Sequence, residues 1–163
     1  MVEFTEELED AIEAEESGLL EVIAERADPD DRRILEAVVR DESSDERYRV
    51  RALYALGNWT EQQDEIVETI ESAYSDLSER ERFTAIDALG RLGTPEARRA
   101  IIDHRDAESP DIRRQVVNAL SRIGDEASRE ELSALLEEEE VDFVRESAQR
   151  QLKRLKGGKD KSE

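Results

Sequence analysis

The chain has 163 residues, of which 42% are charged and 4% aromatic, and a formal net charge of −20. This length allows one domain with a hydrophobic core, and the lack of cysteine excludes a disulfide framework and a thiolate metal site. No apolar run is long enough to cross a bilayer, and the acidic start MVEFTEELED is unlike a signal peptide. We therefore predict a cytoplasmic protein without membrane contact.

Apolar residues recur at helical spacing along most of the chain, which predicts an all-α fold. The first expected element is an amphipathic helix over residues 4–16, whose apolar face holds Phe4, Leu8, Ala11 and Ile12. Residues 17–41 follow as an imperfect pair of helices that turns at Asp28-Pro29-Asp30.

A repeated motif occupies the rest of the chain. It reads YRVRALYALG at 48–57, ERFTAIDALG at 81–90, IRRQVVNALS at 112–121 and VRESAQRQL at 144–152. The arginine in second position recurs at intervals of 33, 31 and 32 residues, as Arg49, Arg82, Arg113 and Arg145. Each copy places small and apolar residues on one face of a first helix, and a second, antiparallel helix follows it. Glu81 departs from the motif because an apolar residue is usual there.

These units give repeats at 43–75, 78–106 and 109–139, and a terminal helix at 141–156. The second helices are predicted to begin at Thr60, at Thr94-Pro95 and near Asp125. Four glycines suit left-handed residues at the ends of the first helices: Gly57, Gly90, Gly93 and Gly124. We predict a single domain over residues 1–156 and a disordered tail over residues 157–163.

The units resemble HEAT repeats, and in particular the short HEAT-like class first described in phycobilisome lyases, over residues 43–155. The resemblance implies a right-handed α-solenoid of antiparallel helix pairs, an ARM-type superhelix, whose concave surface runs along the second helices.

The basic residues are mostly arginine: the chain has 20 Arg and 4 Lys, and the first lysine is Lys153. An acidic surface with arginine but almost no lysine resembles cytoplasmic proteins of salt-accumulating haloarchaea. At molar salt the Debye length is about 3 Å, so repulsion between the carboxylates is screened.

The repeated arginines allow two interpretations. They could form a ladder of cations for an anionic partner, or each could brace the turns by pairing with a nearby carboxylate. We favour bracing, because guanidinium groups suit that role. The expected partners are Asp45, Glu79, Asp111 and Asp142.

Other candidate site residues have simpler explanations. His104 lacks the companions that catalysis or metal binding needs, and its spacing places it on the packed side of its helix. Residues 137–140, all glutamate, are expected to form a solvated acidic face. Trp59 either covers the end of a helix pair or is an exposed anchor for a partner. We expect no catalytic residue, metal site or cofactor.

The function that fits best is a non-enzymatic adaptor or scaffold that binds another protein, with no small-molecule substrate. The candidate contact residues are Trp59, Gln63, Arg98, Arg99 and Glu130. One alternative is a regulatory or chaperone-like subunit of a lyase-type enzyme. The other is nucleic-acid binding, which the net charge disfavours.

Overall fold

The computed structural model describes residues 5–13 and 18–157. Within these ranges the chain forms α-helices and one 3₁₀ segment and no strand, so the all-α prediction is confirmed. The elements are α1 (Glu6–Glu13), α2 (Gly18–Arg26), α3 (Pro29–Arg40), α4 (Glu46–Leu56), α5 (Gln63–Ala73), η1 (Tyr74–Asp76), α6 (Glu79–Leu92), α7 (Pro95–Ile102), α8 (Pro110–Ile123), α9 (Glu126–Glu138) and α10 (Asp142–Gly157). Three predictions lie outside the described residues. They concern the tail beyond Gly157, the placement of Phe4 on the first helix, and the end of that helix after residue 13.

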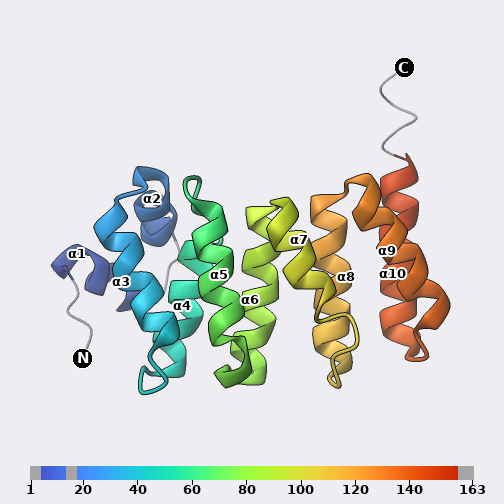
Figure 1. The fold of residues 1–163 in the computed structure, drawn as a ribbon, viewed down its shortest axis with the longest axis horizontal. Helices are drawn as coiled ribbons and strands as arrows, with labels where there is room; N and C mark the ends of the chain where they lie inside the picture. The colour runs from blue at the N-terminus through green and yellow to red at the C-terminus, as the bar shows by residue number, and fades with distance from the viewer. Residues whose placement is uncertain (1–4, 14–17, 158–163) are drawn as a thin grey trace.

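The helices stack in chain order along the long axis of the molecule and form an α-solenoid (Figure 1). Each repeated motif lies on one of the helices α4, α6, α8 and α10, which we call the inner row. The intervening helices α3, α5, α7 and α9 form the outer row. A continuous core of aliphatic side chains runs between the two rows. No helix in the described part of the chain is long and apolar enough to span a membrane.

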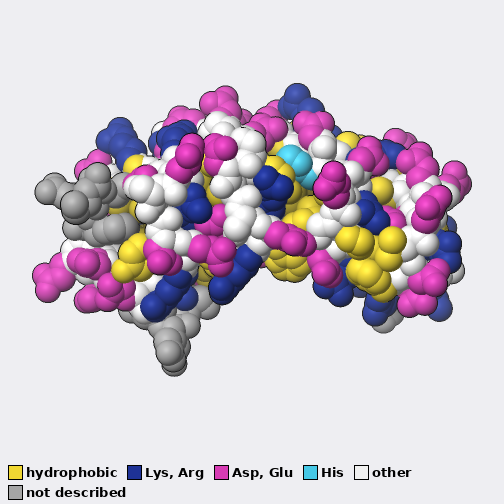
Figure 2. Space-filling view, turned by 90° about the horizontal axis from the view of Figure 1, so that it is seen from below, with side chains coloured by type: hydrophobic (Ala, Val, Ile, Leu, Met, Phe, Trp, Pro, Cys, Tyr) yellow, Lys and Arg dark blue, Asp and Glu magenta, His cyan; other side chains and the backbone are white. Residues whose placement is uncertain are grey.

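The stack curves toward the inner row, because its helices approach one another more closely. Consecutive inner helices pack directly together, whereas α7 and α9 of the outer row make little direct contact. Figure 2 shows the space-filling outline arched, with one margin hollowed. The prediction that the concave surface follows the second helices is therefore wrong: the first helices, which carry the small residues, line it.

Two glycines permit this close approach. A Cβ atom on Gly57 would lie 2.7 Å from the Cα of Ala88, and one on Gly90 would lie 2.9 Å from the Cβ of Ala119. Gly57 has a φ of −65°, and Gly90 lies inside α6, so the prediction that both adopt the left-handed conformation is wrong. Their role is contact between neighbouring helices, for which only the missing side chain matters.

The other two glycines behave as predicted. Gly93 and Gly124 end α6 and α8 with φ values of 67° and 65°. In each case the glycine N–H donates to a leucine carbonyl of the last turn, which is the usual way to close a helix with a left-handed residue.

Replacing Gly57 with alanine is expected to lower the free energy of unfolding by about 1–3 kcal/mol, because the added methyl group meets backbone atoms of α6. Urea unfolding followed by circular dichroism measures the change. Gly18→Ala is the matched control, since nothing lies within 4 Å of the added Cβ atom there. Equal stabilities of the two variants would contradict the close approach.

Most helix starts follow the predicted capping chemistry. The Thr94 hydroxyl accepts the N–H of Ala97 at 3.1 Å, and the Asp125 carboxylate accepts the N–H of Ser128 at 2.9 Å. The predicted start at Thr60 is wrong, because α5 begins at Gln63 after a left-handed Gln62. The intervening turn directs Trp59 into the core, and the chain resumes helical geometry only after that turn.

Candidate functional site

The repeated arginines were the most regular polar feature of the sequence, and Arg49 makes the most buried contact. Its Nε lies 2.6 Å from Oε1 of Glu81, whose side chain is fully buried. The other oxygen of Glu81 accepts the N–H of Ser78 at 2.6 Å, which completes a capping box at the start of α6. One carboxylate thus caps its own helix and binds the preceding inner helix, which explains why this position is not apolar.

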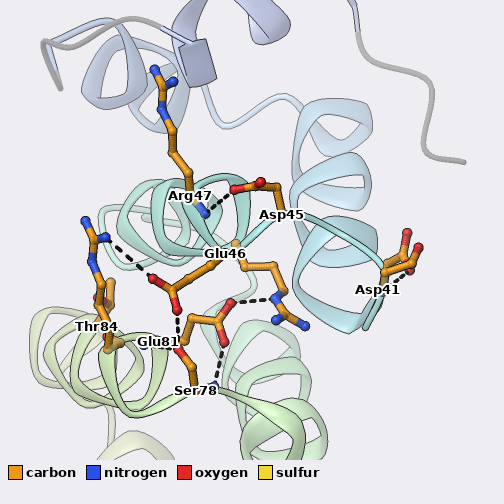
Figure 3. Close-up of polar contacts among 10 residues, drawn as sticks. Asp41, Asp45, Glu46, Arg47, Ser78, Glu81 and Thr84 are labelled. Atoms are coloured by element: carbon orange, nitrogen blue, oxygen red, sulfur yellow. Dashed lines mark hydrogen bonds and ion pairs between the residues drawn. The ribbon is translucent and has the colours of Figure 1, made fainter.

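A second contact joins the same helix starts and recurs in the next repeat. The Ser78 hydroxyl donates to Oε2 of Glu46 at 2.8 Å, so Ser78 lies between the carboxylates of Glu46 and Glu81 (Figure 3). One repeat later, the Ser109 hydroxyl donates to Glu79. These contacts keep consecutive inner helices in the same register.

Arg113 donates two hydrogen bonds to the carboxylate of Glu139, from Nε at 2.8 Å and from Nη2 at 3.0 Å. It also donates to the carbonyl of Ala107 at 2.7 Å, so it joins the start of α8 to the end of α9. The hydrogen bond from Arg113 is the main reason that the pKa of Glu139 lies below its ordinary value. Glu139, whose side chain is 5% exposed, is therefore not part of the predicted solvated acidic face. The other three glutamates of the run, Glu137, Glu138 and Glu140, are exposed as predicted, and Glu138 pairs with Arg105.

The remaining two repeated arginines differ from these. Arg82 donates to the carbonyls of Tyr74 and Ser75 at 3.2 Å and 2.7 Å. Arg145 pairs with Asp142 at 2.6 Å in an exposed position. Of the four predicted partners only Asp142 is found. Asp45 instead caps α4 by accepting the backbone N–H of Arg47, Glu79 accepts the hydroxyl of Ser109, and Asp111 pairs with Arg114. The repeated arginines reach past the helix start toward the preceding turn or the neighbouring repeat.

Trp59 is only 2% exposed, so its assignment as an exposed anchor for a partner is corrected by the structure. Its ring belongs to the core beside α4 and α5, and its carbonyl accepts the side chain of Gln63 at 2.9 Å. Gln63 is half-buried and serves this turn. Trp59 is therefore not available to a partner, whereas Gln63 remains partly exposed.

The positive charges of the arginine pair on α7 are also compensated by neighbouring carboxylates. Arg98 pairs with Asp125, which caps α9, and Arg99 pairs with Glu96 within its own helix at 2.5 Å. The pair is therefore not the isolated basic spot that the sequence indicated. Glu130 is exposed on α9, on the same outer row.

His104 stacks on Tyr74, with ring centroids 3.6 Å apart and an interplanar angle of 18°. Burial is the main cause that lowers the pKa of His104, and it outweighs the carboxylate of Asp103, which acts in the opposite direction. Within the described residues no group of three or more potential ligands could hold a metal ion. The histidine, which follows α7, therefore packs against η1 at the end of the preceding repeat.

The stability of the fold is expected to fall as the pH drops through about 6.5, because the unfolded chain then binds a proton that buried His104 resists. Above this pH both states are neutral at His104 and the contribution is constant. Urea unfolding at several pH values measures the slope, and NMR of the only histidine gives its pKa directly. His104→Phe keeps an aromatic stack and is expected to remove this part of the slope; an unchanged slope would contradict the assignment.

The two rows of helices carry opposite charge. The inner row contains fourteen Arg and Lys residues and seven Asp and Glu residues, a net charge of +7. The outer row contains six Arg and Lys residues and thirteen Asp and Glu residues, a net charge of −7. In Figure 2 dark blue side chains gather along the hollowed margin, and magenta ones are frequent along the opposite margin. A molecule of net charge −20 thus presents a basic concave side.

A polar groove lies on this basic side, where α6, α8 and α10 meet. It encloses about 390 Å³ and is lined by Asp87, Gln115, Asn118, Arg122, Gln151 and Arg154. A hydrogen-bonded chain crosses the groove: Arg154 donates to the Ser121 hydroxyl at 2.6 Å, Ser121 donates to the amide oxygen of Gln151 at 2.9 Å, and the amide nitrogen of Gln151 donates to Asn118 at 3.4 Å. Arg122 pairs with Asp87 at 3.2 Å. The groove therefore offers amide and guanidinium groups side by side.

Sequence reasoning missed this groove because it followed only the arginine in second position of the motif. A second basic position occurs nine residues later in three copies, as Arg91, Arg122 and Arg154. That recurrence can be seen in the sequence. The face of the solenoid on which these arginines lie cannot be read from the sequence, because it depends on how the helices pack.

The chain matches the family model of HEAT repeats over residues 32–110 and again over residues 68–153. The two matches overlap and together include most of the described helices, from α4 to α9. A comparison with curated proteins finds no match. The regular stack of helix pairs agrees with the family match, and the chain belongs to the family of HEAT repeat proteins.

Proposed function

We propose that the protein is a non-enzymatic adaptor or scaffold that binds another protein through the extended surface of its solenoid. The observation that carries the proposal is the basic, hollowed inner row on an otherwise acidic molecule. Arg49 and Arg113 of this row join neighbouring repeats, but exposed arginines such as Arg122 carry positive charge to the surface, where it attracts a partner of the opposite sign. HEAT repeats supply such surfaces without a catalytic centre of their own.

Affinity capture tests this function. The tagged chain is used as bait in a lysate kept at the salt concentration of the source cells, and bound proteins are identified by mass spectrometry. The expected result is a protein that also binds the purified chain in a reconstituted mixture. Turnover of a small molecule by the chain alone, with no protein bound, would overturn the adaptor function.

We further propose that the chain is adapted to high salt in the cytoplasm. The acidic outer row and the near absence of lysine support this. The thermal midpoint is expected to rise as KCl increases from about 0.1 M to about 3 M, because screening relieves repulsion among carboxylates. A variant with Glu68, Glu130 and Glu137 changed to Gln is expected to show a smaller rise. A midpoint that falls with salt would contradict the adaptation.

A further inference from the structure

We propose that the groove across α6, α8 and α10 is the docking site for an acidic, extended segment of the partner protein. The inference deepens the adaptor function proposed above and rests on it, because it assumes that the partner is a protein. The inference specifies that the bound segment of the partner is acidic and extended, and that it docks on α6, α8 and α10.

The charge of the surface selects an acidic ligand. Two exposed guanidinium groups line the groove, those of Arg122 on α8 and Arg154 on α10, and Arg150 is also exposed on α10. Helix α6 contributes the carboxylate of Asp87 to the lining, and its exposed Arg80 lies outside the groove. An acidic segment is attracted to this row and repelled by the outer row, so charge alone directs it to one side of the solenoid.

The lining of the groove matches a peptide in particular. The amide of Gln151 already binds Ser121 and Asn118, whereas the Asn118 side chain, whose oxygen accepts from Gln151, also carries amide N–H groups that can donate to a peptide carbonyl. Guanidinium groups such as those of Arg122 and Arg154 bind carboxylates with two parallel hydrogen bonds. The groove therefore has partners for the backbone and for acidic side chains of the same segment.

The repeat also predicts the spacing of the acidic residues. Arg122 and Arg154 lie at the same position of successive motifs, nine residues after Arg113 and Arg145. Packed helices are about 8–10 Å apart, and an extended segment in the polyproline II conformation advances about 3.1 Å per residue and points every third side chain the same way. An extended segment that crosses α8 and α10 thus meets both arginines when a carboxylate occurs at about every third residue.

A nucleic acid fits this surface less well. Arg114 lies 3.0 Å from Asp111, and Arg122 lies 3.2 Å from Asp87, so carboxylates alternate with the arginines. A duplex places one phosphate charge at about every 1.7 Å along its axis, which brings phosphates onto these carboxylates as well. Spaced acidic side chains avoid this repulsion.

Fluorescence anisotropy with the full chain tests the inference. The probe is a labelled peptide of repeating Gly-Glu-Ser, about twelve residues long, and its Gly-Gln-Ser counterpart is the control ligand. Measurements are made at the lowest KCl concentration at which circular dichroism shows the chain folded. We expect the glutamate peptide to bind at least about tenfold more tightly than the glutamine peptide.

The double variant Arg122→Gln and Arg154→Gln is expected to weaken binding of the glutamate peptide by about tenfold or more. The matched control, Arg33→Gln and Arg99→Gln, removes the same charge from exposed positions of the outer row and is expected to change binding by less than about twofold. Circular dichroism of each variant confirms that it is folded. Equal losses in both double variants would show a general charge effect and overturn the site.

Labelled duplex and single-stranded DNA are titrated under the same conditions. DNA that binds more tightly than the peptide, and is lost in the Arg122 and Arg154 variant, would overturn the peptide assignment in favour of a nucleic acid. If the captured partner binds the variant as well as the unchanged chain, the adaptor function stands and the groove is overturned. If the peptide binds as predicted but no partner protein is recovered, the groove stands and the adaptor function fails.

Discussion

Replacing Trp59 with alanine is expected to lower the free energy of unfolding by about 3–5 kcal/mol. The indole is 2% exposed and belongs to the continuous core, so its removal leaves a cavity beside α4 and α5 that the neighbouring side chains fill only in part. Urea unfolding followed by circular dichroism measures the loss.

Trp59→Phe is the matched control, because it keeps an aromatic ring in the same place and removes less volume. We expect it to cost about half as much or less than alanine. If Trp59→Ala lowered stability by less than about 1 kcal/mol and instead abolished partner capture, the side chain would be a surface anchor after all.

Replacing Glu81 with alanine is expected to lower the free energy of unfolding by about 3–5 kcal/mol. The change leaves the guanidinium group of Arg49 without its carboxylate and the N–H of Ser78 without its cap, both in a place that water scarcely reaches. The side chain of Arg49 is only 11% exposed.

A comparison within the same register isolates the effect of burial. Arg49→Ala removes a buried partner, whereas Arg145→Ala removes an arginine whose side chain is 48% exposed and is expected to cost only about 0–1 kcal/mol. A double-mutant cycle between Arg49 and Glu81 is expected to show a coupling of about 1–3 kcal/mol. Additive losses, with no coupling, would mean that the pair does not join the two repeats.

The period of the solenoid could be predicted from the motif, because each copy places small and apolar residues at the same helical spacing. Thr94, Asp125, Gly93 and Gly124 also follow from local chemistry, since a cap depends on atoms within one helical turn. The start of α5 could not be predicted in this way. Burial of the Trp59 side chain in the core requires a turn after it, and this outweighs the capping preference of Thr60.

The candidate site was less accessible to sequence reasoning. The apparent defect of the motif at Glu81 is the contact that links two repeats, and its partner lies 32 residues away. Three of the four predicted partners of the repeated arginines are wrong for the same reason. An arginine side chain is long enough to reach several acceptors, and only packing selects among them.

The class of fold, the length of the repeat and the acidic character of the chain follow from the amino-acid sequence, because these depend on composition and on spacing along a single helix. Which row of helices is concave, and that the basic residues gather on it, depends on how the helices pack together. Gly57 and Gly90 allow the inner helices to touch, and the stack bends toward the closer contacts. The direction of that bend is a property of many helices packed together, which no segment specifies alone.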